Sequence, residues 1–182
     1  MGIILMNYKS ELIKSMKYLG KKKDTIFLGQ SVVYPGNSMF NTMTKVPLKK
    51  KIELPVFEDV QMGISIGMAL SGFVPITCYP RFDFLICSMN QLVNHLDKIR
   101  KMSSNEMKPK VIIRTSIGSK LPLDGGVQHT QDYTAMFKNI LTEVEVILLD
   151  NKKNIFKNYK KAYERKDNKS TLLIEYGDRY ND

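Results

Sequence analysis

A regular alternation of short apolar runs with helical segments constrains this chain more than any other feature of its sequence. The apolar runs predict strands at 25–28, 73–80, 110–115, 143–150 and 170–176. Helical spacing of apolar residues predicts helices at 8–20, 59–70, 82–102, 132–140 and 151–166, and residues 33–51 are predicted to form a loop. Strands that are short and apolar throughout are typical of a sheet with both faces covered. We therefore expect an α/β fold, a three-layer sandwich with a mainly parallel central sheet flanked by helices.

The size of the chain favours one domain spanning residues 1–182. Of its 182 residues, 43% are hydrophobic, which is enough to bury a core, and we find no internal repeat, low-complexity tract or linker. No apolar stretch approaches the ~18 residues of a membrane helix. The N-terminal apolar run lacks the order of a signal peptide. We therefore expect a soluble cytoplasmic protein that has no membrane partner.

The net charge of +10 raises the alternative of nucleic-acid binding. The positive charges lie in lysine runs such as 21–23 and 49–51, without an RNA-binding aromatic signature, a zinc finger or a basic heptad region. We interpret the excess as solvated lysine on the surface. Cys78 and Cys87 make no disulfide framework, and we find no metal-ligand spacing, so no metal site is predicted in this chain.

Three polar loops follow predicted strands, at 29–37, 79–84 and 116–131. In parallel α/β sheets, sites form at the carboxyl ends of strands. These loops could therefore meet the segment that begins at Glu58, where two carboxylates precede an uncharged stretch at 60–74. From the residues alone, Glu58 has two interpretations: a functional acid, or an acid in the first turn of a helix favoured by the helix dipole.

Several stretches together resemble a known family. They are "PVFEDVQMGISIGMALSGFVPI", "FDF", "NQLVNHLDKIR", "KVIIRTSIG" and "GGVQHTQ". The combination resembles the pyrimidine-binding domain of thiamine-diphosphate enzymes, and is most similar to the β subunit of the decarboxylating component of 2-oxo acid dehydrogenases. Transketolase and deoxyxylulose-phosphate synthase are more distant relatives. The resemblance runs from about residue 25 to residue 178, which is most of the chain.

The resemblance implies roles for particular residues. Glu58 matches the glutamate that hydrogen-bonds a ring nitrogen of the aminopyrimidine and activates the cofactor, a role in which an apolar setting would favour its neutral form. Phe84 matches the aromatic residue beside the pyrimidine, although core packing is the alternative. His129 matches a histidine near the reacting end, where it could move a proton, or it is simply a polar loop residue. Val56 would contact the pyrimidine, and Gln30 stands where the family often has a glutamate.

Arg114 and Gln128 are second-rank site candidates. The chain also departs from the family pattern. Pro80 stands where a bulkier apolar residue commonly contacts the pyrimidine. The chain has no GDG motif of the kind that holds the diphosphate through Mg²⁺. The resemblance therefore implies that a partner subunit holds the diphosphate and Mg²⁺. We also expect the chain to lack the C-terminal domain of the β subunits, which puts docking to an acyltransferase core in doubt.

Our first hypothesis from the sequence is therefore the β-like, pyrimidine-binding subunit of a split thiamine-diphosphate enzyme. It would form an α₂β₂ heterotetramer, including homodimer contacts, with a diphosphate-binding α-type subunit. The substrate would be a small 2-oxo acid or ketose, and the reaction a decarboxylation or two-carbon transfer, with a decarboxylase or carboligase favoured over a dehydrogenase component. The alternatives are a non-catalytic scaffold or regulatory subunit of the same fold and, further off, a basic nucleic-acid-binding protein.

Overall fold

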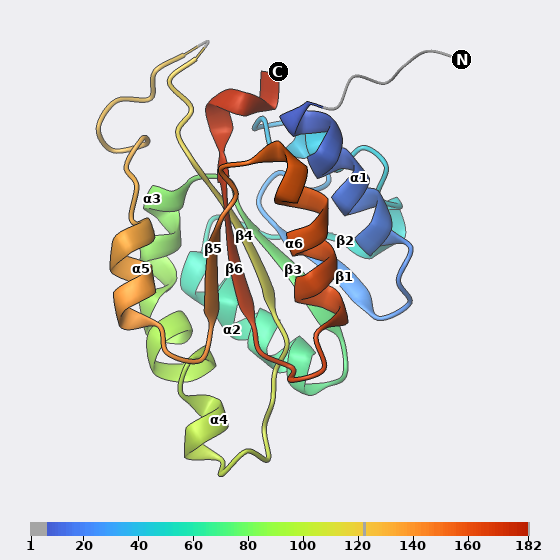
Figure 1. Cartoon of the computed structure of the whole chain (residues 1–182), viewed down its shortest axis with the longest axis vertical. Coiled ribbons are helices and arrows are strands. Elements are labelled where there is room, and N and C mark those ends of the chain that lie inside the picture. The colour runs from blue at the N-terminus through green and yellow to red at the C-terminus, as the bar shows by residue number, and fades with distance from the viewer. Residues whose placement is uncertain (1–6, 122, 182) are drawn as a thin grey trace.

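The computed structural model of the protein describes residues 7–121 and 123–181. Its centre is a six-stranded sheet in the order β2-β1-β3-β4-β6-β5, in which every pair of neighbours is parallel (Figure 1). The strands are β1 (Thr25–Gly29), β2 (Lys51–Glu53), β3 (Val74–Tyr79), β4 (Ile112–Ile117), β5 (Glu145–Leu148) and β6 (Thr171–Tyr176). The predicted α/β class with a parallel sheet is confirmed.

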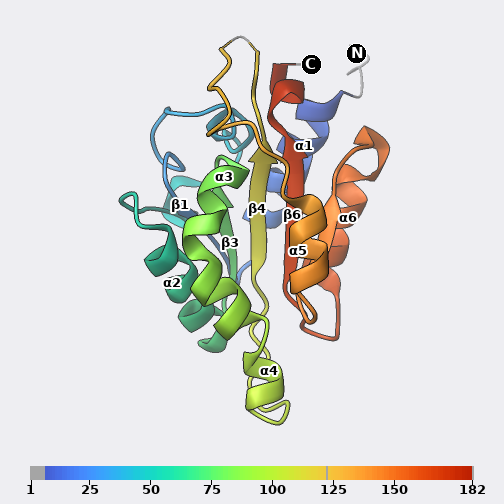
Figure 2. The same ribbon diagram turned by 90° about the vertical axis from the view of Figure 1, so that its left-hand side faces the viewer.

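Helices cover both faces of this sheet. The α-helices are α1 (Tyr8–Gly20), α2 (Glu58–Leu70), α3 (Phe82–Leu85), α4 (Ile99–Met102), α5 (Thr134–Ile140) and α6 (Lys152–Glu164). Figure 2 shows α1 and α6 on one side of the sheet and α2 and α3 on the other. Two cores result, one beneath α1 and α6 and one beneath α2, α3 and α5. The sheet and the helices on its two faces therefore form the three layers of the predicted sandwich.

Local sequence explains where α1 begins and which face it buries. The Asn7 side chain accepts a hydrogen bond from the backbone N–H of Ser10 at 2.7 Å, and the Ser10 hydroxyl accepts one from the N–H of Asn7 at 3.0 Å. This reciprocal capping satisfies two N–H groups that the first helical turn leaves without partners. The buried apolar side chains then recur every three or four residues: Tyr8, Leu12, Met16 and Leu19.

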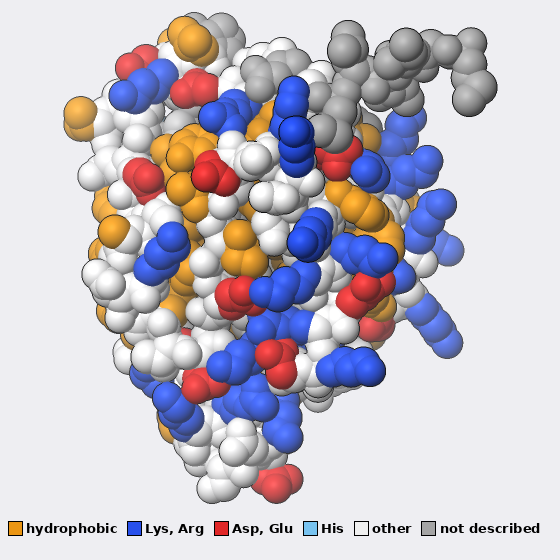
Figure 3. All heavy atoms as spheres, viewed as in Figure 1, with side chains coloured by type: hydrophobic (Ala, Val, Ile, Leu, Met, Phe, Trp, Pro, Cys, Tyr) orange, Lys and Arg blue, Asp and Glu red, His pale blue; other side chains and the backbone are white. Residues whose placement is uncertain are grey.

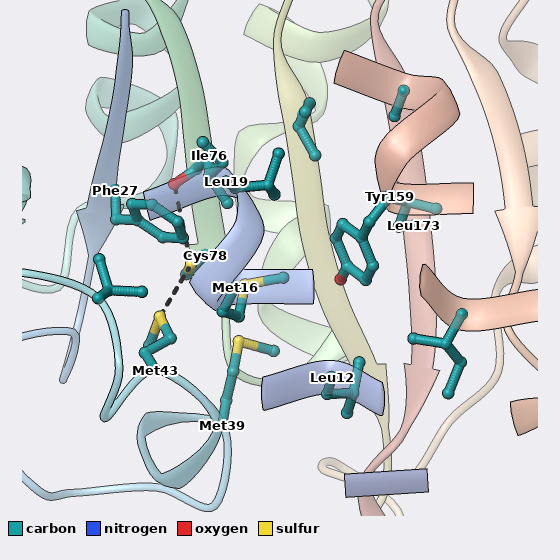
Figure 4. Close-up of a cluster of buried hydrophobic side chains, with 14 of the residues drawn as sticks. Leu12, Met16, Leu19, Phe27, Met39, Met43, Ile76, Cys78, Tyr159 and Leu173 are labelled. Atoms are coloured by element: carbon teal, nitrogen blue, oxygen red, sulfur yellow. Dashed lines mark hydrogen bonds between the residues drawn. The ribbon is translucent and has the colours of Figure 1, made fainter. Parts of the chain in front are cut away.

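The core under α1 and α6 is rich in sulfur. Figure 4 shows Met16, Met39 and Met43 around Cys78, together with Phe27 from β1. Methionine is flexible and polarisable, so it fills irregular gaps well. Met39 and Met43 come from the segment 30–50, which therefore packs its apolar side chains into the core. This packing positions the loop that follows β1 above the carboxyl end of the sheet.

Two predicted elements differ from the structure. β2 (Lys51–Glu53) was not predicted, because its three residues carry two charges and its strand state comes from pairing with Phe27–Gly29 of β1. The single helix predicted at 82–102 is divided into α3, the 3₁₀ turn η3 (Ile86–Ser88), the π-helix η4 (Asn90–Leu96) and α4. Its changes of pitch keep the leucines of this stretch buried in the second core: Leu85, Leu92 and Leu96.

Asp97, at the end of η4, connects this helical stretch to the start of β5. Its Oδ1 accepts hydrogen bonds from the backbone N–H groups of Thr142, Glu143 and Val144 at 2.9, 2.7 and 3.0 Å. Burial raises the pKa of the Asp97 carboxyl, but hydrogen bonds from the Lys98 ammonium and these N–H groups outweigh burial, so the pKa is lowered overall.

Replacement of Asp97 by asparagine should lower the free energy of unfolding by about 1–2 kcal/mol near neutral pH. Because its folded-state pKa lies below the unfolded value of about 3.9, the ionised group stabilises the fold above that pH, and this contribution is lost as the pH falls through the folded-state pKa. The two proteins should therefore converge in acid. Urea unfolding followed by circular dichroism between pH 3 and pH 7 measures this. Asp150→Asn, at an exposed position, is the control and should change stability little.

The outer surface carries most of the basic residues. Figure 3 shows Lys and Arg side chains spread over the face of α1 and α6, with carboxylates between them. Several of these form exposed pairs, such as Lys161 with Glu145 at 2.6 Å. Within the described part of the chain, no helix is both long and apolar enough to cross a membrane.

Candidate functional site

A cavity of about 170 Å³ lies where the segments after β1 and β3 meet the start of α2. It is at the carboxyl end of the sheet, the upper end in Figure 1. Its lining includes Gln30 after β1, Glu58 and Gln61 from α2, and Arg81 and Phe84 after β3. The structure thus brings Gln30, Glu58 and Phe84 together, although they are far apart in sequence.

The Glu58 carboxylate is half-buried at the first residue of α2. Its Oε1 accepts a hydrogen bond from Gln30 Nε2 at 3.1 Å. The Tyr79 hydroxyl donates to the backbone carbonyl of Glu58 at 3.1 Å, which ties the start of α2 to the end of β3. Both sides of the glutamate are therefore held, the carboxylate by a donor that points it toward the cavity and the backbone by a buried tyrosine.

The end of β1 requires a glycine. Gly29 has φ +144°, and a Cβ atom there would lie 2.4 Å from the carbonyl oxygen of Cys78. Any other residue would push β1 away from β3 at the point where Gln30 enters the cavity. Just beyond, the Glu53 carboxylate accepts hydrogen bonds from the backbone N–H groups of Ser31, Val32 and Val33 at 2.5, 2.9 and 2.8 Å. Glu53 therefore shapes the first loop of the site.

Gln61 is a site residue that the sequence analysis missed. It lies one helical turn after Glu58, so it faces the same side of α2, and only 1% of it is exposed. Its Nε2 donates to Thr77 Oγ1 at 2.9 Å and to the Cys78 carbonyl at 3.0 Å. Its Oε1 is buried and has no partner in the described part of the protein. A buried acceptor left unpaired costs free energy, so this oxygen points to a missing donor.

His129 lies next to Phe84, with ring centroids 5.3 Å apart in an edge-to-face arrangement. Its Nδ1 is buried and has no hydrogen-bond partner among the residues described. Arg81 fixes the backbone here, because its Nη1 donates to the carbonyl oxygens of His129 at 3.1 Å and Gly118 at 3.3 Å. The loop after β4 is thus held against the end of β3, and Arg81 is a second residue that the sequence analysis missed.

Three residues named from the sequence lie elsewhere. Val56 precedes α2 with 73% of its surface exposed and does not line the cavity. Its contact with a pyrimidine stays a prediction. Gln128 is exposed, and Arg114 is buried in the core between β4 and β6, where it binds Glu175. Within residues 7–121 and 123–181, no three His, Cys, Asp or Glu side chains gather as they would around a metal ion.

Comparison with known families decides what this arrangement belongs to. The model of one family, the transketolase pyrimidine-binding domain, matches residues 10–181. The chain belongs to this family. The resemblance noted in the sequence is therefore confirmed for nearly the whole chain.

The curated relatives of this pyrimidine-binding domain include β subunits of 2-oxo acid dehydrogenases. It is 26% identical to the β subunit of 2-oxoisovalerate dehydrogenase from Bacillus subtilis, over 74% of this chain and 42% of that protein. It is 29% identical to the β subunit of the pyruvate dehydrogenase E1 component from Rickettsia conorii, over 50% of this chain and 28% of that protein. The chain therefore spans less than half the length of these relatives.

Solved structures agree on the fold. A split-gene transketolase, described as an inactive β4 tetramer, superposes with a TM-score of 0.70 over 94% of this chain and 52% of that one, at 15% identity. A thiamin diphosphate-dependent enzyme of unproven assignment from Mycobacterium smegmatis gives a TM-score of 0.60 over 95% of this chain and 32% of that one, at 12% identity. The predicted thiamine-diphosphate-binding fold is confirmed.

Proposed function

We propose that this pyrimidine-binding domain is the β-like subunit of a split thiamine-diphosphate-dependent enzyme. It would act on a 2-oxo acid or a ketose, by decarboxylation or transfer of a two-carbon unit. The observation that supports this most is the meeting of Glu58, Gln61 and Phe84 in one cavity at the carboxyl end of the sheet. The family and the similarity to β subunits of 2-oxo acid dehydrogenases support the same assignment.

The cavity residues fit an aminopyrimidine ring. Such a ring is flat, has acceptor nitrogens and carries an exocyclic amino group that donates. Phe84 offers an aromatic surface, and the Glu58 carboxyl can hydrogen-bond a ring nitrogen. The unpaired Oε1 of Gln61 can accept from an N–H donor such as the amino group. These residues would hold the pyrimidine half of the cofactor.

The residues of this chain then have distinct tasks. When bound, thiamine diphosphate supplies an electron sink for breaking or forming the bond beside a carbonyl. Glu58 would hold a proton at its carboxyl group and share it with the ring nitrogen. Gln30 keeps the Glu58 carboxylate oriented through the 3.1 Å hydrogen bond. His129, beside Phe84, would donate a hydrogen bond or move a proton at the substrate.

A partner subunit would complete the active site. The GDG motif is missing from the sequence, so we assign the diphosphate and Mg²⁺ to an α-type subunit. We propose an α₂β₂ heterotetramer with contacts between the two β-like chains. The relatives named as β subunits support this division, and so does the split-gene transketolase whose β4 tetramer is described as inactive.

The surface of α2 is suited to meet such a partner. Apolar side chains stand exposed along it and beside it: Val56, Phe57, Val60, Ile64, Leu70 and Phe73. Gly67 lies among them, and a Cβ atom there would meet nothing within 4 Å. A glycine on an exposed helix surface weakens the helix. The missing side chain is an advantage only where another chain packs closely against the helix backbone. We assign this face of α2 to an interface between subunits.

Replacement of Gly67 by leucine should separate folding from assembly. In the isolated chain the side chain enters open space and improves helix propensity, so the free energy of unfolding should stay the same or rise by up to about 1 kcal/mol. In the mixture with the partner, the dissociation constant should rise at least about tenfold, because overpacking an interface is costly. Lys157→Leu, on the exposed side of α6, is the control. Equal binding of the partner by both variants would show that this face of α2 does not contact the partner.

Calorimetry tests the proposed function as a whole. Thiamine diphosphate with Mg²⁺ is titrated into this chain, into its diphosphate-binding partner and into the mixture, and release of CO₂ from 2-oxo acids is then measured. We expect cofactor binding and turnover in the mixture only. Binding without turnover of any 2-oxo acid or ketose would favour the scaffold alternative. Strong salt-dependent binding to RNA or DNA, with no partner found, would favour the nucleic-acid alternative.

A further inference from the structure

The lysine excess of the chain is concentrated on the surface formed by α1 and α6, here called the α1/α6 face. Residues 8–24 contain six lysines and two acids, and residues 152–167 contain six lysines, one arginine and two acids. These two segments therefore carry nine of the ten net positive charges of the chain. Both helices lie on the side of the sheet away from α2, and Figure 3 shows their basic side chains gathered there.

Aromatic side chains join the two helices into one continuous surface. The ring of Tyr18 on α1 lies edge-to-face against Phe156 and Tyr163 of α6, with centroids 5.5 and 6.2 Å apart. The ammonium group of Lys22 lies 4.3 Å from the centre of the Tyr18 ring, and that of Lys14 lies 4.5 Å from the centre of the Phe156 ring. These cation–π contacts hold two of the positive charges where the helices meet.

The acids of the α1/α6 face do not neutralise it, because each already has a partner within the fold. Glu11 and Asp167 are held in ion pairs with a neighbouring lysine and arginine, at 3.2 and 2.6 Å. Glu164 and Asp24 accept hydrogen bonds from tyrosine hydroxyls at 2.6 and 2.8 Å. Several exposed lysines of the face are in no ion pair with any described residue, among them Lys17, Lys21, Lys23, Lys152, Lys153 and Lys157.

The placement of these lysines opposes the stability of α6. Lys152 and Lys153 are the first two residues of the helix, and its first turn contains no acid. The N-terminus of a helix carries a partial positive charge, so cations there are unfavourable. Lys157 stands four residues after Lys153 and four before Lys161, and like charges at that spacing also weaken a helix. An anion bound to this face would offset both effects.

The spacing of the lysines complements a row of phosphates. Lys14, Lys17 and Lys21 follow one another along α1 at steps of three and four residues, and Lys153 and Lys157 are four apart on α6. Each such step is a rise of about 4.5–6 Å along the helix axis. A nucleic-acid strand presents one negative charge per nucleotide in a regular row, so rows of ammonium groups can follow it.

A membrane or a folded protein suits the α1/α6 face less well. Both helices bury their apolar side chains in the first core, and no large hydrophobic side chain is exposed within residues 8–20 or 152–164. A helix that binds a membrane inserts an exposed apolar face, and the centre of a protein interface is rich in apolar and aromatic side chains. Lysine without such anchors is suited to phosphates, which it binds as a point charge.

We propose that the α1/α6 face binds a strand of nucleic acid through its phosphates, without reading its bases. Contacts between ammonium groups and phosphates position a strand but carry no sequence information. The face lies across the sheet from α2, so the strand and a partner subunit seated on α2 can bind at the same time. The inference does not depend on the proposed function.

Fluorescence anisotropy tests this proposal on the full chain and requires no turnover. A labelled single-stranded RNA of about 20 nucleotides and mixed sequence is titrated with the protein between about 50 and 200 mM salt. We expect a dissociation constant on the order of 10⁻⁶ to 10⁻⁴ M at physiological salt, which rises steeply as salt is added. A second RNA of unrelated sequence and a single-stranded DNA of the same length should bind similarly.

The triple variant Lys17→Gln, Lys153→Gln, Lys157→Gln should weaken RNA binding at least about tenfold. The slope of log K against log salt should fall by about two, because each lost contact with a single strand contributes about 0.7. Glutamine forms helices about as well as lysine, so the variant should fold, and far-ultraviolet circular dichroism checks this.

The matched control removes the same charge from exposed positions outside the α1/α6 face. Lys108→Gln, Lys120→Gln, Lys138→Gln changes three lysines that are in no ion pair with any described residue. This variant should keep most of the affinity for RNA. Equal weakening by both triple variants would show that binding follows net charge alone, and would overturn the inference.

The remaining outcomes are equally decisive. Absence of RNA binding by the wild-type chain would overturn the inference. Binding to polyglutamate as tight as to RNA would assign the face to an acidic protein, and binding to phosphatidylglycerol vesicles but not to RNA would assign it to a membrane. RNA binding that depends on the face, in a mixture that binds no cofactor, would retain the inference and reject the proposed function. Cofactor turnover without RNA binding would do the reverse.

Discussion

Replacement of Glu58 by glutamine is expected to abolish turnover by the assembled enzyme while leaving the cofactor bound. Glutamine has the same shape, and its amide oxygen can accept the hydrogen bond that Gln30 donates at 3.1 Å. It cannot release or take up a proton at neutral pH, so sharing of a proton with the pyrimidine ring is lost. Loss of a positioned proton-transfer group typically lowers a rate on the order of 10²- to 10⁴-fold, and we expect kcat to fall by that factor.

Asp59→Asn is the matched control for this experiment. Asp59 is also an acid in the first turn of α2, and its Oδ2 lies 3.5 Å from Gln91 Nε2. If the acids serve only the helix dipole, both substitutions should cost a similar 0.3–1 kcal/mol or so in stability, and neither should change kcat much. A large loss of kcat in Glu58→Gln alone supports the proposed role. Equal turnover by Glu58→Gln and the wild type would reject it. Calorimetry with thiamine diphosphate checks that binding persists.

The largest effect on stability is expected from Arg114→Met. Arg114 and Glu175 have no exposed surface, and they bind through two contacts, Nε to Oε1 at 2.5 Å and Nη2 to Oε2 at 2.9 Å. The Tyr180 hydroxyl also donates to Glu175 Oε2 at 2.5 Å, and the Tyr159 hydroxyl donates to Oε1. Removing the guanidinium leaves a buried carboxylate without a counter-charge, which typically costs about 3–5 kcal/mol.

Urea unfolding measures this loss of stability. The transition is monitored by far-ultraviolet circular dichroism, because the chain contains no tryptophan. Lys161→Met is the control. It breaks the surface pair with Glu145, in which the lysine side chain is 55% exposed, and should cost no more than about 1 kcal/mol. The double variant Arg114→Met, Glu175→Leu should recover part of the stability, because it removes the unpaired charge. A loss below about 1 kcal/mol for Arg114→Met would contradict the expectation.

This buried pair also bears on the site. Arg114 Nη2 donates to Thr42 Oγ1 at 2.7 Å, and Thr42 belongs to the segment between β1 and β2 whose earlier residues line the cavity of the candidate site. The network therefore fixes that segment to the centre of the sheet. We expect the Arg114 variant to lower cofactor affinity as well as stability, although Arg114 itself does not line this cavity.

The sequence by itself determined the class of fold. Runs such as 74–79 and 171–176 consist mainly of apolar residues, and only a strand covered on both faces buries nearly every side chain of such a run. The helical spacing of Tyr8, Leu12 and Met16 likewise specifies which face of α1 packs on the sheet. These signals are local, since the side chains that produce them are neighbours in the chain. The family followed from motifs that are equally local.

Only the tertiary structure decided which residues meet. β2 has no local signal and exists because β1 supplies its hydrogen bonds. Arg114 stands in a motif shared with the family, yet the buried carboxylate of Glu175, 61 residues further along, draws it into the core. Gln61 became visible only as a buried side chain whose Oε1 has no partner among the described residues. Arg81 became visible only through its hydrogen bonds to the carbonyls of His129 and Gly118. The physical reason is the same in each case: pairing of charges and donors across a sheet depends on contacts between distant segments, which no local pattern records.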